Sequence, residues 1–253
     1  MHKRRARLLE LLRERGQMDV AELVEALGVS EATVRRDLAA LEEEGLLTRT
    51  FGGARLHEEA SLVVRTFEQK REHMGEQKQR IARRAAGRVH PGMTVALDSG
   101  TTVWCIASAL KPRGPLTVVT SALAAVEELG SVENIEVHLT GGRFRLDNLD
   151  FIGPRAIESL QGFHADLAFL SADAFAPGDG LFSSDEWSAA ISKALAACAD
   201  HVVLAIDHSK FGTRGPFRSL ATDGLDVLIT DDGLKDPARA AAANDPYELI
   251  IAD

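Results

Sequence analysis

The first 56 residues place apolar side chains with the period of an α-helix. Three such stretches are separated by residues that begin or end helices: Gly16 and Gly45 are typical stops, and Asp19 and Ser30 are typical N-caps. The third stretch repeats its apolar positions at intervals of four and three residues, which gives one buried stripe and leaves the opposite face polar. The predicted helices cover residues 3–15, 20–27 and 31–44.

Two short strand-like segments follow the third predicted helix, at 46–50 and 54–56. They flank Phe51, Gly52 and Gly53, and a Gly-Gly pair suits a tight hairpin. Two helices, a turn and a third helix with a polar face form the helix-turn-helix layout, in which the last helix enters the major groove of DNA. Because a hairpin behind this layout is typical of a wing, we predict a winged helix-turn-helix domain over residues 1–56.

Candidate DNA contacts lie at the start of the third helix and on the hairpin. Arginine binds guanine edges or phosphate oxygens, and hydroxyl groups donate to phosphates or bases. The alternative is a three-helix packing module with a solvated arginine face. The residues expected to contact DNA are Ser30, Thr33, Arg35, Arg36, Arg49, Gly52, Gly53 and Arg55.

Residues 57–75 are polar and lack a clean period, which indicates a linker with a partly helical end. A helical pattern resumes at Glu76 and stops before Pro91. The basic residues on this helix are interpreted as a solvated face rather than a second DNA site. They are Lys78, Arg80, Arg83, Arg84 and Arg88.

Apolar strands alternate with helical stretches from residue 94 onward. Strands are predicted at 94–97, 116–119, 135–139, 167–170, 202–206, 227–229 and 249–251. Helices are predicted at 102–110, 122–129, 154–160, 187–199 and 237–243. This alternation implies βαβ units and a largely parallel sheet, so residues 76–253 are predicted to form an α/β domain. Ligands of such sheets bind outside the carboxyl ends of the strands.

The string Asp98-Ser99-Gly100-Thr101-Thr102 follows the first of these strands and opens directly into a helix. Glycine allows a sharp turn, the hydroxyls supply donors, and a helix N-terminus adds free N–H groups and the positive end of its dipole. Together these features predict a phosphate-binding loop. The string matches neither a Walker A loop nor a Rossmann glycine fingerprint, so nucleotide binding has no support.

Polar residues also follow the later strands. Carboxylates accept hydrogen bonds from sugar hydroxyls, and lysine pairs with phosphate. Since the carboxyl ends of parallel strands meet at one edge, these groups predict a site for a phosphorylated sugar. The further candidates are Thr120, Ser121, Gly141, Gly142, Asp173 and Lys210.

Composition and charge limit the classes of protein to which the chain can belong. Hydrophobic residues make up 45% of the 253 residues, which is typical of a globular protein, and no apolar run is long enough to span a membrane. Residues 1–56 carry ten basic and ten acidic side chains, so the net charge of −9 lies in the remainder. The two cysteines, Cys105 and Cys198, lack disulfide or metal spacing and are expected in the core. We expect a cytoplasmic protein without cofactor, metal or membrane association.

Both halves resemble the DeoR family of transcriptional regulators. In the first half the resemblance rests on LGVSEATVRRDL at 27–38, followed by LExxGLLxR at 41–49 and the GGA string at 52–54. In the second half it rests on Glu76-x-Lys78, LDSGTT at 97–102, TGG at 140–142 and DHSKFG at 207–212. The resemblance implies a winged helix-turn-helix followed by a larger Rossmann-like α/β sensor domain related to ribose-5-phosphate isomerase.

The same resemblance implies a repressor of a sugar or polyol operon that a phosphorylated sugar releases from operator DNA. It also implies that Ser99 to Thr102 hold the phosphate, and that Asp98, Asp173, Glu186 and Lys210 surround the sugar. One departure is visible, because the family usually has Thr-Asn-Ser where this chain has Thr120-Ser121-Ala122. We expect a homo-oligomer, either dimer or tetramer, because paired half-sites about 34–36 Å apart raise specificity.

Two other functions fit parts of the pattern. One is a sugar-phosphate isomerase that carries a DNA-binding domain, with Asp173 and Glu186 as acid and base. The interval between these residues contains no lysine, whereas ribose-5-phosphate isomerases have one there, so we expect no catalytic residues and no enzyme activity. The other is a DNA-binding protein whose second domain only forms oligomers, which the polar strand ends argue against.

Overall fold

The computed structural model of the chain describes residues 3–15, 17–43, 47–50, 52–56 and 67–253. The chain divides into two compact units, residues 1–63 and 64–253, and each is described by itself. Gly16, Gly45, Phe51 and residues 57–66, which the sequence analysis used, lie outside the described residues.

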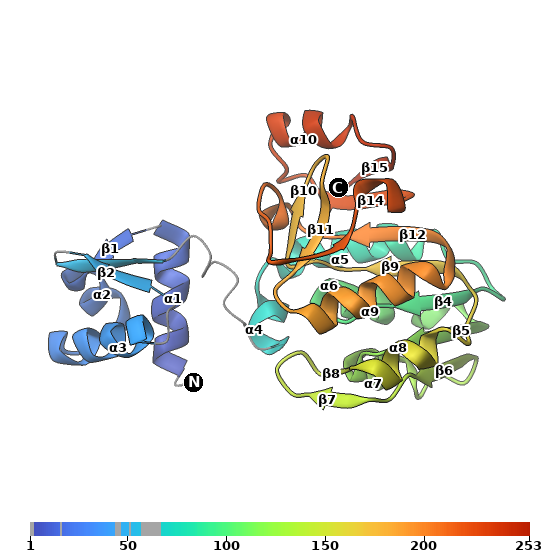
Figure 1. Ribbon diagram of the computed structural model, residues 1–253, viewed down its shortest axis with the longest axis horizontal. Coiled ribbons are helices and arrows are strands. Elements are labelled where there is room, and N and C mark those ends of the chain that lie inside the picture. The colour runs from blue at the N-terminus through green and yellow to red at the C-terminus, as the bar shows by residue number, and fades with distance from the viewer. Residues whose placement is uncertain (1–2, 16, 44–46, 51, 57–66) are drawn as a thin grey trace. The chain divides into compact units, whose positions relative to one another are not determined.

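The first unit contains the predicted helices and hairpin, with one further strand (Figure 1). The additional strand β1 pairs antiparallel with β3, giving a small sheet of order β1-β3-β2. Asp19 caps α2 in a capping box, in which its side chain accepts from the backbone of Glu22 and the Glu22 side chain accepts in return. The elements are α1 (Lys3–Arg15), β1 (Gln17–Asp19), α2 (Val20–Leu27), α3 (Glu31–Glu43), β2 (Leu47–Thr50) and β3 (Gly53–Leu56).

A buried ion pair ties α1 to α3. Asp37 of α3 is 3% exposed, and its carboxylate accepts from Arg4 Nε at 2.6 Å and from Arg5 Nε at 3.1 Å. Burial alone would raise the pKa of Asp37, but the two guanidinium groups hold it below its ordinary value. The charged carboxylate therefore helps to fix α3 against α1. The two helices also share the leucine-rich hydrophobic core of this unit.

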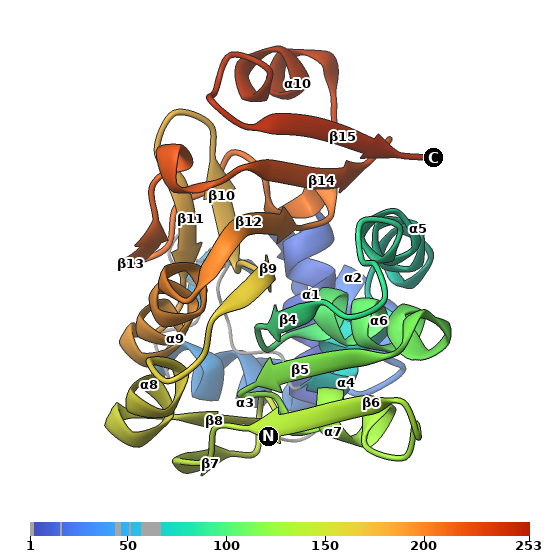
Figure 2. The same ribbon diagram turned by 90° about the vertical axis from the view of Figure 1, so that its right-hand side faces the viewer.

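A parallel seven-stranded sheet forms the centre of the second unit, in the order β15-β14-β12-β9-β4-β5-β6 (Figure 2). The predicted strands are confirmed, and several extend one to three residues beyond their predicted ends. The strands are β4 (Thr94–Leu97), β5 (Leu116–Thr120), β6 (Ile135–Leu139), β9 (Ala165–Leu170), β12 (Ala199–Ala205), β14 (Val227–Asp231) and β15 (Glu248–Ala252).

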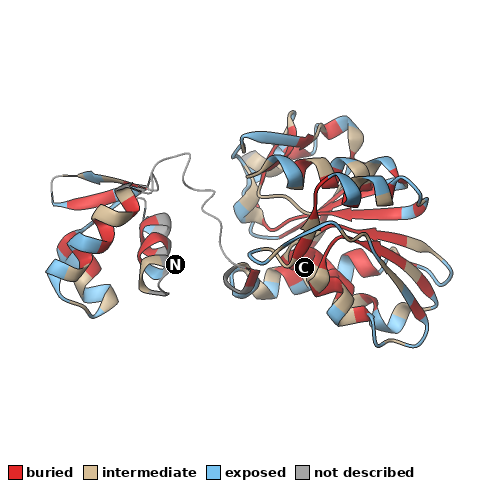
Figure 3. Cartoon of the chain, turned by 60° about the horizontal axis from the view of Figure 1, so that its bottom comes forward, coloured by how far each residue is buried: buried red, intermediate tan, exposed pale blue. Residues whose placement is uncertain are grey.

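Helices cover both faces of this sheet because successive residues of a strand point to opposite sides. Val95 and Leu97 of β4 pack in a core with α5, α6 and α7, whereas Ala96 packs in a second core with α8 and α9. Figure 3 shows the buried residues concentrated along the strands between these layers. The helices are α4 (Phe67–Glu72), α5 (Gly75–Ala86), α6 (Thr101–Leu110), α7 (Leu123–Leu129), α8 (Pro154–Leu160), α9 (Glu186–Ala197) and α10 (Asp236–Ala242), with 3₁₀ turns η2 (Lys111–Arg113), η3 (His208–Lys210) and η4 (Thr222–Gly224).

Two features near the start of this unit differ from expectation. Residues 67–72, expected in the partly helical end of a linker, do form a helix, α4, but this helix belongs to the second compact unit. Lys78, expected on a solvated face of α5, is only 3% exposed, so that interpretation was wrong for this residue. Its ammonium group reaches backbone carbonyls at the end of α4, which offset the cost of burying the charge.

Short antiparallel pairings complete the unit, and the sequence analysis did not predict them. One is the hairpin of β7 (Arg143–Arg145) and β8 (Asp150–Ile152). The other is a three-stranded sheet of β10 (Ala174–Ala176), β11 (Gly180–Ser183) and β13 (Phe217–Leu220). Both follow strands of the main sheet, so they place additional side chains beside its carboxyl edge.

Candidate functional site

The order of the strands places the predicted phosphate loop at the switch point of the sheet. From β4 the chain proceeds outward through β5 and β6, and then returns to continue from β9 on the other side of β4. Ligands of open parallel sheets bind where the direction reverses in this way. Asp98 to Thr102 follow β4, and Ser171 to Asp173 follow β9, so both segments lie at this point.

The loop after β4 is shaped by a glycine. Gly100 has φ of 114°, a conformation that side chains rarely adopt, and a Cβ atom there would lie 2.7 Å from Ser171 Oγ. The Ser171 hydroxyl donates to the carbonyl of Ser99 at 2.6 Å. Thr101 and Thr102 then begin α6, whose first N–H groups have no partner within the helix. The loop therefore offers donors at the position where we predicted a phosphate.

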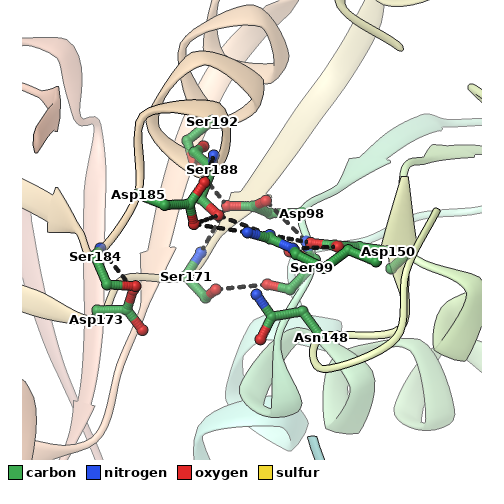
Figure 4. A network of polar contacts seen from close by, with 12 residues as sticks. Asp98, Ser99, Asn148, Asp150, Ser171, Asp173, Ser184, Asp185, Ser188 and Ser192 are labelled. Carbon is green, nitrogen blue, oxygen red and sulfur yellow. Dashed lines mark hydrogen bonds and ion pairs between the residues drawn. The ribbon is translucent and has the colours of Figure 1, made fainter. Parts of the chain in front are cut away.

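Asp98 is buried beneath this loop, at 5% exposure. Its carboxylate accepts from the Ser99 backbone at 2.8 Å, from Ser192 Oγ at 2.9 Å and from the Ser171 backbone at 3.4 Å. Burial raises the pKa of Asp98 to about 7, because loss of solvation outweighs these three donors. Figure 4 shows Asp98 facing Ser171 and Ser192. This carboxyl group changes charge close to neutral pH.

The predicted residues after β5 and β6 have separate roles. Thr120 Oγ1 donates to the carbonyl of Leu97 at 2.8 Å and accepts from the Ala122 backbone at 3.0 Å, so it ties β5 to β4. Ser121 Oγ is buried and has no hydrogen-bond partner. Gly142 has φ of 112°, and a Cβ atom on it would lie 2.7 Å from the carbonyl of Ile152. Backbone conformation and packing are therefore enough to explain why this residue is a glycine, and no ligand is needed. Gly141, with φ of 68°, occupies the same turn.

Asp173 interacts with two lysines, Lys70 and Lys210. Its Oδ1 is 3.6 Å from Lys70 Nζ, and its Oδ2 accepts from the backbone and hydroxyl of Ser184 at 2.9 and 2.8 Å. Burial alone would raise the pKa of Asp173, but the charges of Lys70 and Lys210 and the two Ser184 bonds hold it below its ordinary value. Lys210, at the end of η3, is thus close enough to act on Asp173 electrostatically. Glu186 is the first residue of α9 and is exposed.

A cluster of hydrogen bonds and ion pairs centred on Arg145, beside the carboxyl edge of the main sheet, was missed by the sequence analysis. Arg145 of β7 donates to both oxygens of Asp150, at 2.9 and 2.7 Å, and also to Asp185 and Ser188, at 2.7 and 2.8 Å. Its pKa is raised, because these carboxylates outweigh the effect of burial. Figure 4 shows Asp150 and Asp185, from β8 and the start of α9, on either side of the cluster. Because Asp185 and Ser188 are distant from Arg145 in the sequence, no local motif marks the whole cluster.

The predicted DNA-contacting residues lie on α3 and on the β2–β3 hairpin. The Ser30 hydroxyl is 2.9 Å from the Thr33 hydroxyl, and Arg36 and Arg55 are exposed. Gly52 is exposed with φ of 95°, and its carbonyl accepts from the backbone of Val20 at 2.8 Å. The remaining glycine, Gly53, is buried in β3 where this strand pairs with β1. A Cβ atom on Gly53 would lie 2.2 Å from the carbonyl oxygen of Met18. Packing therefore accounts for its lack of a side chain.

Two of the four candidate arginines have acidic partners in the same unit. Arg35 Nη2 lies 2.7 Å from Glu31 on α3, and Arg49 Nε lies 2.6 Å from Glu42. Both arginine side chains are at least half exposed, so each pair is weak and the guanidinium can exchange its partner for a phosphate. These two glutamates are among the ten acidic side chains that balance the ten basic ones in residues 1–56.

No group of three or more His, Cys, Asp or Glu side chains among the described residues has the placement of a metal site. None of the helices in the described ranges is both long and apolar enough to cross a membrane.

Among solved structures, the chain aligns with ribose 5-phosphate isomerase A from Methanocaldococcus jannaschii with a TM-score of 0.41 and 18% sequence identity, over 55% of this chain and 55% of that one. These values are too low to bear on activity. Any statement about function therefore has to rest on the residues of the site and on relatives with higher sequence identity.

Closer matches cover both units. Residues 4–60 match the DeoR-like helix-turn-helix domain, and residues 73–232 match the DeoR C-terminal sensor domain. The chain is 37% identical to the HTH-type transcriptional repressor CsqR of Escherichia coli strain K12, covering 98% of this chain and 94% of that protein. It is 31% identical to the putative aga operon transcriptional repressor of E. coli O157:H7, over 98% and 93% of the two chains.

A third relative, the glycerol-3-phosphate regulon repressor of E. coli strain K12, is 31% identical over 88% of each chain. Both domains of the family are therefore present in their usual order, the helix-turn-helix on α2 and α3 and the sensor domain around the parallel sheet. The fold, the loop at its switch point and these near full-length matches agree, and the chain belongs to the DeoR family of transcriptional regulators.

Proposed function

We propose that this protein represses an operon of sugar or polyol metabolism by occupying operator DNA, and that a phosphorylated sugar releases it. The observation that carries the proposal is the loop Ser99–Thr102 at the switch point of a DeoR-type sensor domain. Relatives named as repressors of the aga operon and of the glycerol-3-phosphate regulon support the metabolic role.

The DNA-binding part of the proposal assigns α3 to the major groove. Ser30, Thr33, Arg35 and Arg36 lie in or before its first two turns, which is where recognition helices contact bases and phosphates. Arg49 and Arg55 of the hairpin bind flanking phosphates. Arginine–phosphate contacts release counterions, so the affinity for DNA falls steeply with salt concentration.

The effector part of the proposal assigns the phosphate to the N-terminus of α6 and the sugar to the polar groups around it. Ser121 has a hydroxyl without a protein partner, and a ligand oxygen would satisfy it once the side chains that cover it move. Asp98, Asp173 and Lys210 border the same edge, with Asp173 ionised and able to accept from sugar hydroxyls. Glu186 joins them only if its exposed side chain turns toward the ligand.

We propose further that the protein acts as a homo-oligomer, either dimer or tetramer, in which the effector shifts a two-state equilibrium. In one state the DNA-binding units match two operator half-sites, and in the other they do not. Catalysis is not part of the proposal. Aldose–ketose conversion that depends on Glu186 would overturn this assignment.

Thermal unfolding tests the effector class without knowledge of the operator. Both tryptophans, Trp104 and Trp187, lie in the second unit, so their fluorescence reports that unit alone. A ligand at about 100 times its Kd stabilises by roughly 2.7 kcal/mol, which raises the midpoint by about 5–10 °C for a protein of this size. We expect such a rise with one or two sugar or polyol phosphates and none with the unphosphorylated compounds. Absence of any rise across the panel would refute the effector assignment.

A further inference from the structure

The β7–β8 hairpin has two faces of different character. On one face, Arg145 donates to Asp150 across the hairpin and to Asp185 at the start of α9. On the other face, Phe144 and Phe151 pair across the hairpin, with 5.3 Å between their ring centroids. Because successive side chains of a strand point to opposite sides, the phenylalanines point away from α9. The hairpin is therefore fixed to the unit by its arginine face, and its phenylalanines form an outer face.

Large apolar side chains at this hairpin are exposed. Phe144 is 43% exposed, and Leu146, directly after β7, is 73% exposed. Leu139, at the end of the edge strand β6, is 37% exposed. Figure 2 shows β6 and the hairpin along one border of the unit. Exposed apolar side chains that gather in this way mark an interaction surface.

Strand β7 also has an open edge. Among the described residues it pairs with β8 alone, so its other side presents N–H and C=O groups to which no strand is paired. An open edge is a template for a strand of another chain. The turn after β7 is held in place, because the carbonyls of Asp147 and Leu149 accept from the backbones of Phe67 and Leu123, each at 2.8 Å. The edge is therefore preorganised, which lowers the entropy that pairing costs.

The charges along this edge are self-complementary. Arg143 begins β7 and Asp147 lies in the turn after it, and neither of these exposed side chains has an ion-pair partner in the part of the chain that the structure describes. In an interface with two-fold symmetry, residue i of one copy contacts residue j of the other, and j contacts i. If two copies of β7 lie antiparallel about Arg145, Arg143 is opposite the partner's Asp147, and Phe144 is opposite the partner's Leu146. Opposite charges and apolar pairs at such positions both stabilise antiparallel strands.

We propose that this edge is an interface between two copies of the chain, which pair antiparallel along β7. Arg145, at the centre, does not repel its counterpart, because Asp150 and Asp185 of its own chain compensate its charge. A surface with one charge at each end and apolar side chains between them fits a second copy of itself better than a uniformly charged partner such as DNA. The proposal rests on the proposed function only for the homo-oligomer, to which it assigns a surface.

Charge reversal tests the register. Arg143→Asp places like charges opposite each other twice in each dimer, and Asp147→Arg does the same. Sedimentation equilibrium of the full-length protein measures association. Each single variant is expected to weaken it about tenfold or more, and the double variant Arg143→Asp, Asp147→Arg to recover most of the loss. Arg155→Asp, which reverses a charge on the exposed face of α8, is the control and should have no effect.

The outcomes separate the interface from the homo-oligomer. Association that neither single variant weakens would overturn the interface and leave the homo-oligomer of the proposed function in place. Weakening without recovery in the double variant would overturn the antiparallel register. A parent protein that is monomeric at every concentration, both free and on DNA, would refute the interface and the homo-oligomer together.

Cross-linking tests the apolar pair. One protein carries Phe144→Cys and a second carries Leu146→Cys, while the native Cys105 and Cys198 are buried. Opposite residues of antiparallel strands have Cβ atoms about 4.5–5.5 Å apart, which a small adjustment brings within disulfide reach. After subunit exchange, mild oxidation of the mixture is expected to give covalent dimers, and oxidation of either protein alone to give few. Equal yields from the mixture and from the separate proteins would contradict the proposed pairing.

The last measurement connects this interface to DNA. Affinity is measured by fluorescence anisotropy on a duplex that the wild type selects from a random library. Arg143→Asp is expected to bind this duplex more weakly than the wild type does, and the double variant to bind it as the wild type does. Equal affinity of all three proteins would show that this dimer is not the DNA-binding form. If the wild type selects no duplex, the DNA-binding part of the proposed function fails, whereas sedimentation still decides the interface.

Discussion

At the scale of single residues, Asp98 is a group whose acid–base chemistry is strongly altered by the fold. The unfolded chain ionises this carboxyl near pH 3.8, whereas burial raises the pKa of Asp98 in the folded protein to about 7. Between these values the folded state binds a proton that the unfolded state does not. The stability that this proton contributes is fully present below pH 3.8 and is lost as the pH rises to about 7.

Asp98→Asn should therefore flatten the pH dependence of stability of the second unit. Relative to the variant, the wild type is expected to lose stability from pH 5 to pH 7 and little more above that. Urea unfolding followed by tryptophan fluorescence measures the difference, with Asp223→Asn as the control at an exposed carboxylate. A constant difference between wild type and Asp98→Asn across this range would show that Asp98 does not titrate there.

The sequence was informative about this residue only in part. A carboxylate after the first strand, followed by Ser-Gly-Thr-Thr, marked Asp98 as a site residue, since strand ends carry ligands in parallel sheets. Its burial, and the bond from Ser192, depend on the packing of α9 over β4, which no local pattern encodes. The same holds for Lys70, whose contact with Asp173 joins distant segments.

At the scale of elements, the long apolar segments were predictable and the short polar ones were not. The strands and helices of the main sheet follow hydrophobic periods, and their predicted cores match the structure within a few residues. By contrast, β1, β7 and β8 contain three residues each, too few to show a period, and they form because neighbouring strands and turns present backbone partners. The Arg145 cluster lies on one of these elements, which is why it was missed.

Arg145 joins the β7–β8 hairpin to α9, so its removal should destabilise the unit. Arg145→Met leaves the Asp150 carboxylate, 2% exposed, without its cation, and breaking such a buried pair costs about 3 kcal/mol. Urea unfolding by tryptophan fluorescence is the measurement. Adding Asp150→Asn to this variant should recover part of the loss, because the uncompensated charge is then removed. Stability unchanged by Arg145→Met would show that the cluster contributes nothing to the fold.

On α3, the pairing of Arg35 with Glu31 makes a separate prediction. Because both side chains are exposed, Glu31→Gln should leave folding stability unchanged. The freed guanidinium, and the loss of a negative charge near the DNA phosphates, should tighten DNA binding several-fold and steepen its dependence on salt. Fluorescence anisotropy on the selected duplex measures both effects. Glu25→Gln on α2 is the control for net charge, and an equal gain in both variants would rule out a specific role for the Arg35 pair.

At the scale of the whole molecule, the chain joins two units with separate cores and separate chemistry. The first presents arginines on a helix and a hairpin without net positive charge. The second presents the loop to which we assign the phosphate, at the switch point of a parallel sheet. In the proposed account each unit is necessary and neither is sufficient. Variants of one unit should therefore spare the binding function of the other.

The most direct test of this account is the affinity of the full-length protein for its selected duplex, measured with and without a saturating sugar phosphate. The account predicts a drop of about tenfold or more for the wild type, the usual scale of allosteric coupling. It predicts no drop for Thr101→Asp, whose charge repels phosphate, and loss of DNA binding but retained thermal stabilisation by the sugar phosphate for the double variant Arg35→Ala, Arg36→Ala. An unchanged wild-type affinity, at a concentration that demonstrably stabilises the second unit, would contradict it.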